Sequence, residues 1–213
     1  MMSTKRKGSY VYVFVNAEDY LTFSLGNRKI SGNVAIFNLP AGAGATGTCP
    51  QSCPNCYALK AQRAYPSARR ARERNLRVLQ KHGAGTIAVA VQYLADRHPL
   101  KAIRIHEAGD FYSAQYFWDW NIAANILKEY GVPVWTYSKR YTRKDVFSDN
   151  LNLVESILPD GSLNFGPYEW VRKKQDQYGL HICPATQRDG KGLICCRDCT
   201  ICMDHAQVLF VQH

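Results

Sequence analysis

The stretch that decides the fold begins at Lys101-Ala-Ile-Arg-Ile-His106, continues through residues 113–130 and ends at Val132-Pro-Val-Trp-Thr-Tyr137. The first and last segments are rich in β-branched and aromatic residues, which is typical of buried strands. Residues 113–130 repeat apolar side chains at helical spacing, with Ser113 to cap the start and Gly131 to end the helix. A strand, a helix and a strand in this order predict a βαβ unit with parallel strands.

The flanking segments extend this pattern in both directions. Residues 10–15 and 20–25 predict an N-terminal β-hairpin, and residues 33–39 predict a strand that Pro40 ends. Residues 57–81 predict a helix with a break near Pro66, and residues 86–95, 146–158, 162–165 and 207–211 predict a helix, a helix, a short strand and a strand. We therefore expect one α/β domain with a hairpin extension (1–32), an α/β core (33–178) and a Cys-rich C-terminal element (179–213).

Composition and charge limit the classes of function. The 213 residues are 46% hydrophobic and 21% charged, which suits one well-buried globular core. The formal net charge of +10 favours an anionic partner, with nucleic acid first and an anionic small molecule or membrane surface second. The alternative is that the basic residues only keep the domain in solution. A basic segment at residues 58–81 favours a functional face, and its candidate phosphate contacts are Arg69, Arg70, Arg72, Arg74 and Arg77.

Eight cysteines in this chain call for an explanation. We find no secretion signal and no apolar run long enough to span a bilayer, so we expect a cytoplasmic protein that is not membrane-bound. In a reducing compartment, eight cysteines are more often metal ligands, catalytic groups or buried thiols than four disulfides.

Three of the cysteines form the run Cys49-Pro-Gln-Ser-Cys53-Pro-Asn-Cys56, which follows the Gly-rich segment 41–48. Short spacings in a loop let several thiolates converge on one small inorganic body. Three thiolates would leave one iron of a four-iron cluster open, whereas a structural zinc site closes all four positions and would need a further donor, which the C-terminal cysteines could supply. An iron–sulfur cluster is the first interpretation, zinc the second and inert buried cysteines the third.

A second group of polar residues follows the strand at 101–106. His106, Glu107, Asp110 and Ser113 come where a parallel strand ends, which is where α/β sheets build their sites. Glu107 or Asp110 could accept a hydrogen bond from an ammonium group, and His106 could move protons or bind metal. The structural alternative is that Asp110 and Ser113 cap the next helix and that His106 is a partly buried, hydrogen-bonded residue.

A third group lies near the C-terminus. Cys196, Cys199 and Cys202 are spaced three apart, and Cys183-Pro184 offers a fourth ligand. Four thiolates would suit a second [4Fe-4S] cluster or zinc, and the sequence leaves both open. Cys195 is a spare thiol, either an alternative ligand or a buried residue.

The chain resembles the phage gene product 88 family. The resemblance rests on Asn38-Leu-Pro40, Thr48-Cys49-Pro50, Cys56-Tyr-Ala58, Ala64-Tyr-Pro66, residues 72–75, the segment from Arg104 to Ser113, Tyr116-Phe-x-x-Trp120 and Trp135-Thr-Tyr-Ser-Lys139. It implies a protein encoded by a phage or a mobile element.

The Cys-x3-Cys-x2-Cys run also resembles the signature of radical S-adenosylmethionine (SAM) enzymes. Two features depart from that pattern: Asn55 stands before the third cysteine where an aromatic residue is usual, and His106-Glu-Ala-Gly-Asp110 replaces the usual Gly-Gly-Glu-like segment. The resemblance implies a partial (β/α) barrel, a [4Fe-4S] cluster on Cys49, Cys53 and Cys56, and reductive cleavage of SAM. It further implies that Glu107, Gly109, Asp110 and Ser113 contact SAM and that His106, Glu107 and Asp110 serve catalysis.

These observations combine into one functional hypothesis and two alternatives. The hypothesis is a radical-SAM-like iron–sulfur protein that acts on nucleic acid. The alternatives are a non-catalytic nucleic-acid-binding module held together by metal, and a redox or host-interaction protein. The sequence indicates neither the substrate nor the oligomeric state.

Overall fold

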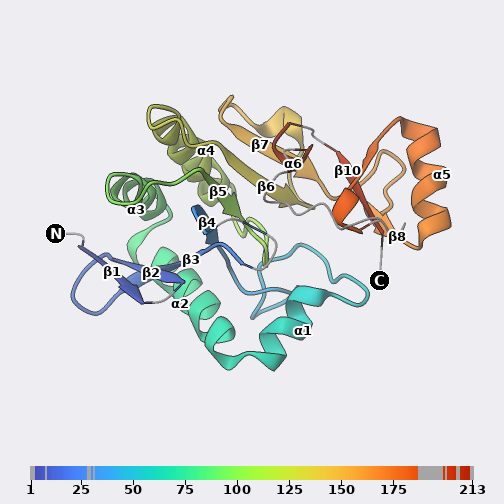
Figure 1. Cartoon of the computed structure of the whole chain (residues 1–213). Helices are drawn as coiled ribbons and strands as arrows, with labels where there is room; N and C mark the ends of the chain where they lie inside the picture. The colour runs from blue at the N-terminus through green and yellow to red at the C-terminus, as the bar shows by residue number, and fades with distance from the viewer. Residues whose placement is uncertain are drawn as a thin grey trace.

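The structure is a computed structural model that describes residues 3–7, 9–27, 30, 32–186, 199, 201–204 and 207–211. Cys195 and Cys196 lie outside the described residues. Figure 1 shows a central sheet with helices packed against it and a smaller C-terminal sheet beside it.

The main sheet has seven strands in the order in which they occur along the chain. They are β1 (Ser3–Lys7), β2 (Tyr10–Phe14), β3 (Tyr20–Leu25), β4 (Val34–Phe37), β5 (Ala102–Ile105), β6 (Val134–Ser138) and β7 (Leu151–Glu155). Strands β1 to β4 pair antiparallel, whereas β4 to β7 pair parallel. The predicted hairpin is confirmed as β2 and β3, and it continues the same sheet because β3 pairs with β4.

Helices connect the parallel strands. Between β4 and β5 lie α1 (Tyr57–Ala64), α2 (Pro66–His82) and α3 (Thr86–Ala95); α4 (Ala114–Lys128) joins β5 to β6, and the 3-10 turn η1 (Arg143–Asp145) precedes β7. The predicted break at Pro66 is confirmed, because Pro66 starts α2 at a position where its missing N–H costs nothing. The predicted βαβ units and parallel strands are likewise confirmed.

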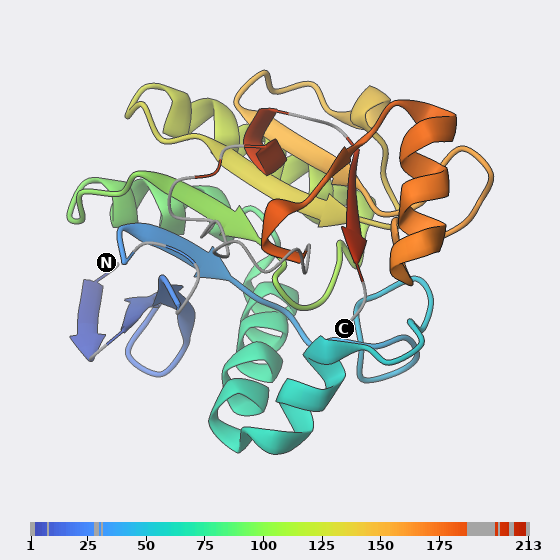
Figure 2. The same cartoon turned by 45° about the vertical axis from the view of Figure 1, so that its right-hand side comes forward.

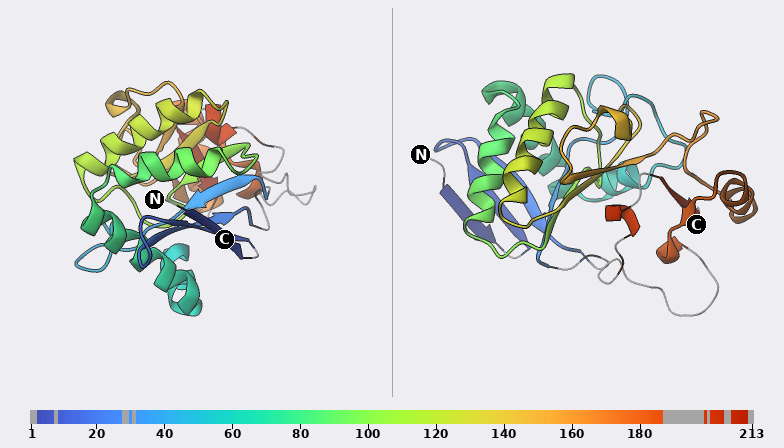
Figure 3. Two further views of the ribbon diagram at one scale, coloured as in Figure 1. Left: turned by 90° about the vertical axis from the view of Figure 1, so that its left-hand side faces the viewer. Right: turned by 90° about the horizontal axis from the view of Figure 1, so that it is seen from above.

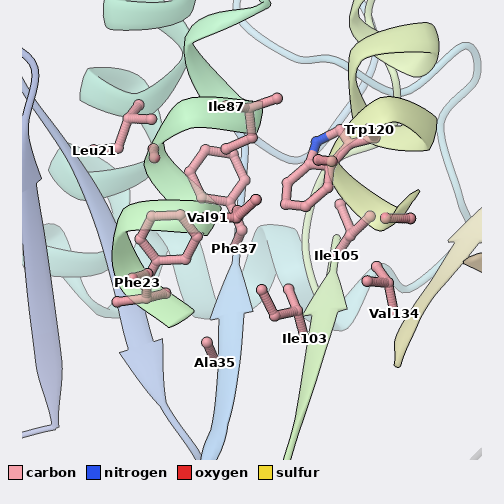
Figure 4. Close-up of a cluster of buried hydrophobic side chains, with 14 of the residues drawn as sticks. Leu21, Phe23, Ala35, Phe37, Ile87, Val91, Ile103, Ile105, Trp120 and Val134 are labelled. Atoms are coloured by element: carbon pink, nitrogen blue, oxygen red, sulfur yellow. The ribbon is translucent and has the colours of Figure 1, made fainter. Parts of the chain in front are cut away.

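The main core lies between the sheet and helices α3 and α4. On β5, Ile103 and Ile105 point to this side, where they meet Val91 of α3 and Trp120 of α4. Figure 4 shows these side chains together with Phe37 of β4 filling the layer between strands and helices. The period-2 alternation of β5 therefore settles which face of the sheet is covered by helices.

The opposite face of the sheet carries a different set of side chains. Ile36 and Trp135 are buried there, and Met203 of the short helix α6 (Ile201–Asp204) packs against their cluster. Figures 2 and 3 show α6 on the side of the sheet away from α3 and α4. The C-terminal element thus covers the face of the sheet that α3 and α4 leave uncovered.

A three-stranded parallel sheet completes the described fold. Its order is β8 (Phe165–Gly166), β10 (Val208–Val211) and β9 (His181–Ile182), with α5 (Tyr168–Tyr178) packed against it and the 3-10 turn η2 (Pro184–Thr186) after β9. No helix of the described part is both long and apolar enough to cross a bilayer.

Two parts of the prediction differ from the structure. The helix predicted at residues 146–158 is wrong, because β7 occupies Leu151–Glu155: Leu151 and Leu153 face the main core while Val154 faces the other side, which is strand alternation. The prediction also omits α5, whose sequence gives little periodic signal because Val171 is its only fully buried residue.

Candidate functional site

The Cys-containing loop leaves the sheet at the carboxyl end of β4. The carboxyl ends of β5 and β6 lie at the same edge, because the three strands are parallel and adjacent. Loops at this edge are where α/β sheets commonly bind ligands. Residues 38–56, 106–113 and 138–141 therefore form one cluster of loops, which we call the carboxyl-edge site.

The Gly-rich segment folds back on itself to place Cys49. The Thr48 N–H and hydroxyl both donate to the Pro40 carbonyl, at 3.1 and 2.9 Å, and the Cys49 N–H donates to the Gly42 carbonyl at 3.0 Å. A Cβ atom on Gly47 would lie 1.9 Å from the Gly42 oxygen. Glycine is required at Gly47 because the two arms of the loop touch there.

The β5 loop is locked against this Gly-rich segment. The Asp110 N–H donates to the Thr48 hydroxyl at 3.0 Å, and the Leu39 N–H donates to the Ala108 carbonyl at 3.1 Å. Gly109 has a φ of +89° and passes so close that a Cβ would lie 2.7 Å from the Thr48 hydroxyl oxygen. Gly109 is thus explained by backbone packing between the two loops.

Asp110 joins the β5 loop to the end of β6. Its buried carboxylate accepts from the Ser138 hydroxyl at 2.9 Å, from the Lys139 N–H at 2.8 Å and from the Phe111 N–H at 2.8 Å. Burial raises the pKa of this carboxyl, although the hydrogen bonds from Lys139, Phe111 and Ser138 oppose that shift. Three protein donors already occupy the carboxylate, so its geometry supports a positioning role.

The Lys139 side chain lies near the cysteine loop, close enough to Cys53 and Cys49 for its charge to act on both residues. Burial disfavours the ammonium charge, but the neighbouring Cys53, Cys49 and Asp110 outweigh it and raise the pKa of Lys139. Burial also raises the pKa of the Cys49 thiol, with a Gly42 backbone hydrogen bond and the Lys139 charge acting against the shift. The sequence prediction assigns Lys139 no role, although a polar residue directly after a buried strand is a usable signal.

Cys56 lies at the start of α1. It immediately precedes α1, follows Asn55 at a φ of +52°, and packs in a small cluster with Ala41, Ala58 and Ala108. Within the described residues, no group of three or more His, Cys, Asp or Glu side chains is arranged to hold a metal ion. Cys49 and Cys53 thus lie near Lys139, while Cys56 packs in the small apolar cluster at the start of α1.

Glu107 lies on a polar chain that crosses the sheet edge. Its carboxylate accepts from Arg104 at 3.2 Å and from the Asn27 amide at 2.9 Å, and its carbonyl accepts from the Tyr57 hydroxyl at 2.7 Å. The Arg104 guanidinium in turn lies 5.3 Å from the ring centroid of Tyr137. Glu107 remains partly exposed, so it is the carboxylate of this site that can meet a ligand.

His106 is a buried residue at the base of the β5 loop. It is 3% exposed, adopts a φ of +58°, and places Nε2 3.1 Å from the Tyr116 hydroxyl oxygen. Burial lowers the pKa of His106 to about 3 and raises that of Tyr116 well above its ordinary value. The imidazole is therefore neutral at pH 7, and its environment is that of the core.

This environment predicts acid sensitivity. Below pH 6.5 the unfolded chain takes up a proton on His106 that the folded protein excludes down to about pH 3, so stability is full above pH 6.5 and falls as the pH drops. We expect a loss of roughly 1 kcal/mol per pH unit from this residue. Urea unfolding at pH 7, 6 and 5 measures it, with His106→Asn as the comparison because asparagine tolerates positive φ. Equal pH slopes in the two proteins would contradict the assignment.

Ser113 caps α4, and its hydroxyl accepts from the Tyr116 N–H at 3.2 Å. This interaction accounts for a serine at the first turn of the helix, where an orphan N–H would otherwise lack an acceptor. Helix capping thus explains the serine at this position. A contact between Ser113 and a cofactor stays a prediction.

Two of the C-terminal cysteines lie in one cluster on the face of the sheet opposite α3 and α4. Cys183 and Cys202 belong to one cluster with Val154 and Val208, and both lie close to Tyr137. Burial raises the pKa of Tyr137 well above its ordinary value, with the Cys202 charge acting in the same direction. Cys199 is partly buried, while Cys195 and Cys196 lie outside the described residues.

The predicted basic residues do not share one surface. Arg69, Arg70 and Arg77 are exposed on α2, whereas Arg72 is buried and donates to the Ala58 carbonyl at 3.0 Å. Arg74 is partly buried, with its guanidinium 4.4 Å from the ring centroid of Tyr20. Arg72 therefore holds α2 against α1 and faces away from any phosphate at the surface.

The chain was compared with known protein families, curated proteins and solved structures. Residues 13–204 match the model of the family described as Gene product 88. Neither the comparison with curated proteins nor the comparison with solved structures found a match. The matched segment covers both interlocked loops, the βαβ units and most of the C-terminal element. The chain belongs to the phage gene product 88 family.

Proposed function

We propose that this protein is an iron–sulfur protein of radical-SAM-like type, with Cys49, Cys53 and Cys56 holding a [4Fe-4S] cluster. One observation carries the proposal: the three-cysteine loop emerges at the carboxyl end of β4, the first of four adjacent parallel strands, and Cys49 and Cys53 lie near the Lys139 ammonium. A single cation beside two thiols suits a site that collects negative charge.

The winding of the sheet supports a partial (β/α) barrel. Strands β4 to β7 follow one another in chain order, and α3 and α4 lie on one face. In a barrel, strands in this order enclose an interior on the face without helices. Here that face bears Arg104, Tyr137, Cys183 and Cys202, so a ligand at the carboxyl edge would lie beside it.

The residues present fit the proposed cluster in kind and number. Three thiols in one short loop match a cluster with one iron open to a non-protein ligand. Binding would require the three thiols, which are not grouped for a metal in the described residues, to converge within the segment that contains Asn55 at positive φ. When bound, the cluster would supply single electrons to a molecule at that open iron.

The protein groups of the site divide into contact and positioning roles. Glu107 is the candidate acceptor for the ammonium group of SAM, because its carboxylate is partly exposed and fixed by Arg104. Asp110 and Gly109 hold the β5 loop against the cysteine loop, and Asp110 also fixes the backbone of Lys139. His106, neutral and buried beneath them, supports the same loop.

A second metal site is proposed on Cys183, Cys196, Cys199 and Cys202, with a [4Fe-4S] cluster or zinc as its occupant. Its support is that Cys183 and Cys202, far apart in the sequence, reach one cluster at Tyr137. Metal bound there would fasten the C-terminal element to the sheet.

The enzymatic half of the proposal has a direct test. Protein reconstituted with iron and sulfide under anaerobic conditions, then reduced, should convert SAM to 5′-deoxyadenosine, measured by chromatography. Glu107→Gln should lower this activity at least tenfold if the carboxylate holds the ammonium, since about 1.4 kcal/mol of binding corresponds to tenfold. Intact cluster with no SAM binding or turnover would overturn the enzymatic proposal and leave the cluster assignment standing.

A further inference from the structure

We infer that the corner between α1 and α2 binds single-stranded nucleic acid, by stacking bases on Tyr65 and contacting phosphates with the surrounding cations. This inference goes beyond the proposed cluster chemistry and does not depend on it. Figure 1 shows the two helices meeting at an angle on the lower side of the molecule, away from the C-terminal sheet and α5.

Tyr65 occupies the turn between the two helices. Its backbone is extended, with φ −121° and ψ 92°, and its side chain is 63% exposed. A tyrosine ring that is largely exposed at the turn between two helices offers an open face to a planar ligand. Nucleic-acid bases stack on such rings, and stacking is tolerant of sequence because every base has a π face.

The charge around Tyr65 is strongly positive. Residues 57–82 contain eight Lys and Arg residues and a single acidic residue, Glu73. Five of these cations are exposed: Lys60, Arg63, Arg69, Arg70 and Arg77. Arg69 forms an ion pair with Glu73, with 3.9 Å between the charged groups. The exposed ion pair contributes little, so the surface keeps its excess of positive charge.

The same helices distinguish structural arginines from surface arginines. Arg72 is buried against the Ala58 carbonyl, and Arg74 packs over Tyr20. Arg63, Arg69 and Arg70 instead lie within five residues of Tyr65 and are exposed. Cations around an exposed aromatic ring suit single-stranded nucleic acid, which has unpaired bases that can stack and a negatively charged backbone.

Tyr57 connects this corner to the carboxyl-edge site. Its hydroxyl donates to the Glu107 carbonyl at 2.7 Å, yet the residue is 64% exposed at the start of α1. Because Tyr57 directly follows Cys56, a nucleic-acid strand that stacks a base on Tyr65 and runs along α1 would approach the cysteine loop. If the proposed function holds, this surface would deliver a nucleic-acid substrate to it.

The test is binding of fluorescent single-stranded DNA and RNA 20-mers to the full-length protein, followed by anisotropy at several salt concentrations. We expect affinity to fall with salt, and Tyr65→Ala to weaken binding about tenfold, as loss of one stacked base predicts. Tyr65→Phe should retain most of the affinity. The Arg69→Ala/Arg70→Ala double variant should make the slope of log K against log salt shallower by about 1.4, which is two phosphate contacts on a single strand.

A matched control lies on α5, which carries the exposed Tyr168, Arg172 and Lys173. Tyr168→Ala and Arg172→Ala should leave the affinity unchanged. Equal losses in the α5 variants, no binding at low salt, tighter binding of duplex than of single strands, or binding only to anionic phosphatidylserine vesicles would each overturn the inference. Iron content is measured on the same samples, so failure of nucleic-acid binding and failure of the cluster are separate results.

Discussion

Replacing Cys53 with alanine is expected to remove nearly all iron and sulfide from the anaerobically reconstituted protein. Cys53 is the middle ligand of the proposed trio and lies near the Lys139 ammonium. With Cys49 and Cys56 alone, too few thiolates remain to hold a four-iron cluster. The measurement is iron and sulfide per protein with the visible absorption spectrum, compared between wild type and Cys53→Ala.

Two controls make this result interpretable. Ser52→Ala changes an exposed neighbour in the same loop and should keep the full cluster content. Cys202→Ala should remove only the metal of the C-terminal site, since Cys202 lies in the cluster around Tyr137. If Cys53→Ala retains the iron, sulfide and spectrum of the wild-type protein, the loop is not the ligand set.

The second large effect is expected on stability, from Asp110→Ala. The substitution would leave the buried Ser138 hydroxyl, the buried Phe111 N–H and the partly buried Lys139 N–H without their acceptor. Each unsatisfied buried donor costs about 1–3 kcal/mol, and because such costs are not additive we expect a total loss of about 3–5 kcal/mol. Urea unfolding at pH 7 followed by circular dichroism measures the change.

Asp149→Ala is the matched control for this variant. Asp149 also has a hydrogen-bonded partner, Lys128 at 2.6 Å, but both side chains are largely exposed. Exposed ion pairs contribute little, so its stability should stay close to that of the wild type. A loss for Asp110→Ala no greater than that for Asp149→Ala would contradict the positioning role of the buried carboxylate. Asp110→Asn, which keeps one acceptor oxygen, should fall between the two.

The strand and helix order could be predicted because the apolar patterns of this chain are strong where the core is deep. Ile103 and Ile105 alternate in β5, and both point into the layer against α3 and α4. The segment at 146–158 misled the prediction because buried residues on both faces of β7 blur its alternation: Leu151 and Leu153 lie in one cluster and Val154 in another. Such a strand resembles a short buried helix in composition.

The candidate site could be located from sequence but not assembled from it. Spacing indicates that Cys49, Cys53 and Cys56 are near one another along the chain, whereas their directions depend on loop conformation, such as the positive φ of Asn55. Lys139 follows β6, 86 residues after Cys53 in the sequence, so only the sheet order brings the two residues near each other.

The burial of Arg72 in α2 could have been predicted from the helical periodicity of the sequence. Arg72 precedes Asn75 by three residues and Leu79 by seven, so all three share one face of the helix, and both partners are buried. Counting charges along residues 58–81 ignores this periodicity. The helical face, more than the number of cations, separates the arginine that holds α1 to α2 from those available at the surface.

The central claim is that thiols of the 49–56 loop hold an iron–sulfur cluster with one open iron. Electron paramagnetic resonance of the anaerobically purified, reduced protein, with iron, sulfide and zinc determined on the same sample, tests it most directly. The account predicts the signal of a reduced [4Fe-4S] cluster that changes when SAM is added and disappears in Cys53→Ala. A loop that carries no metal, or one whose thiols bind zinc together with a fourth sulfur, would contradict it.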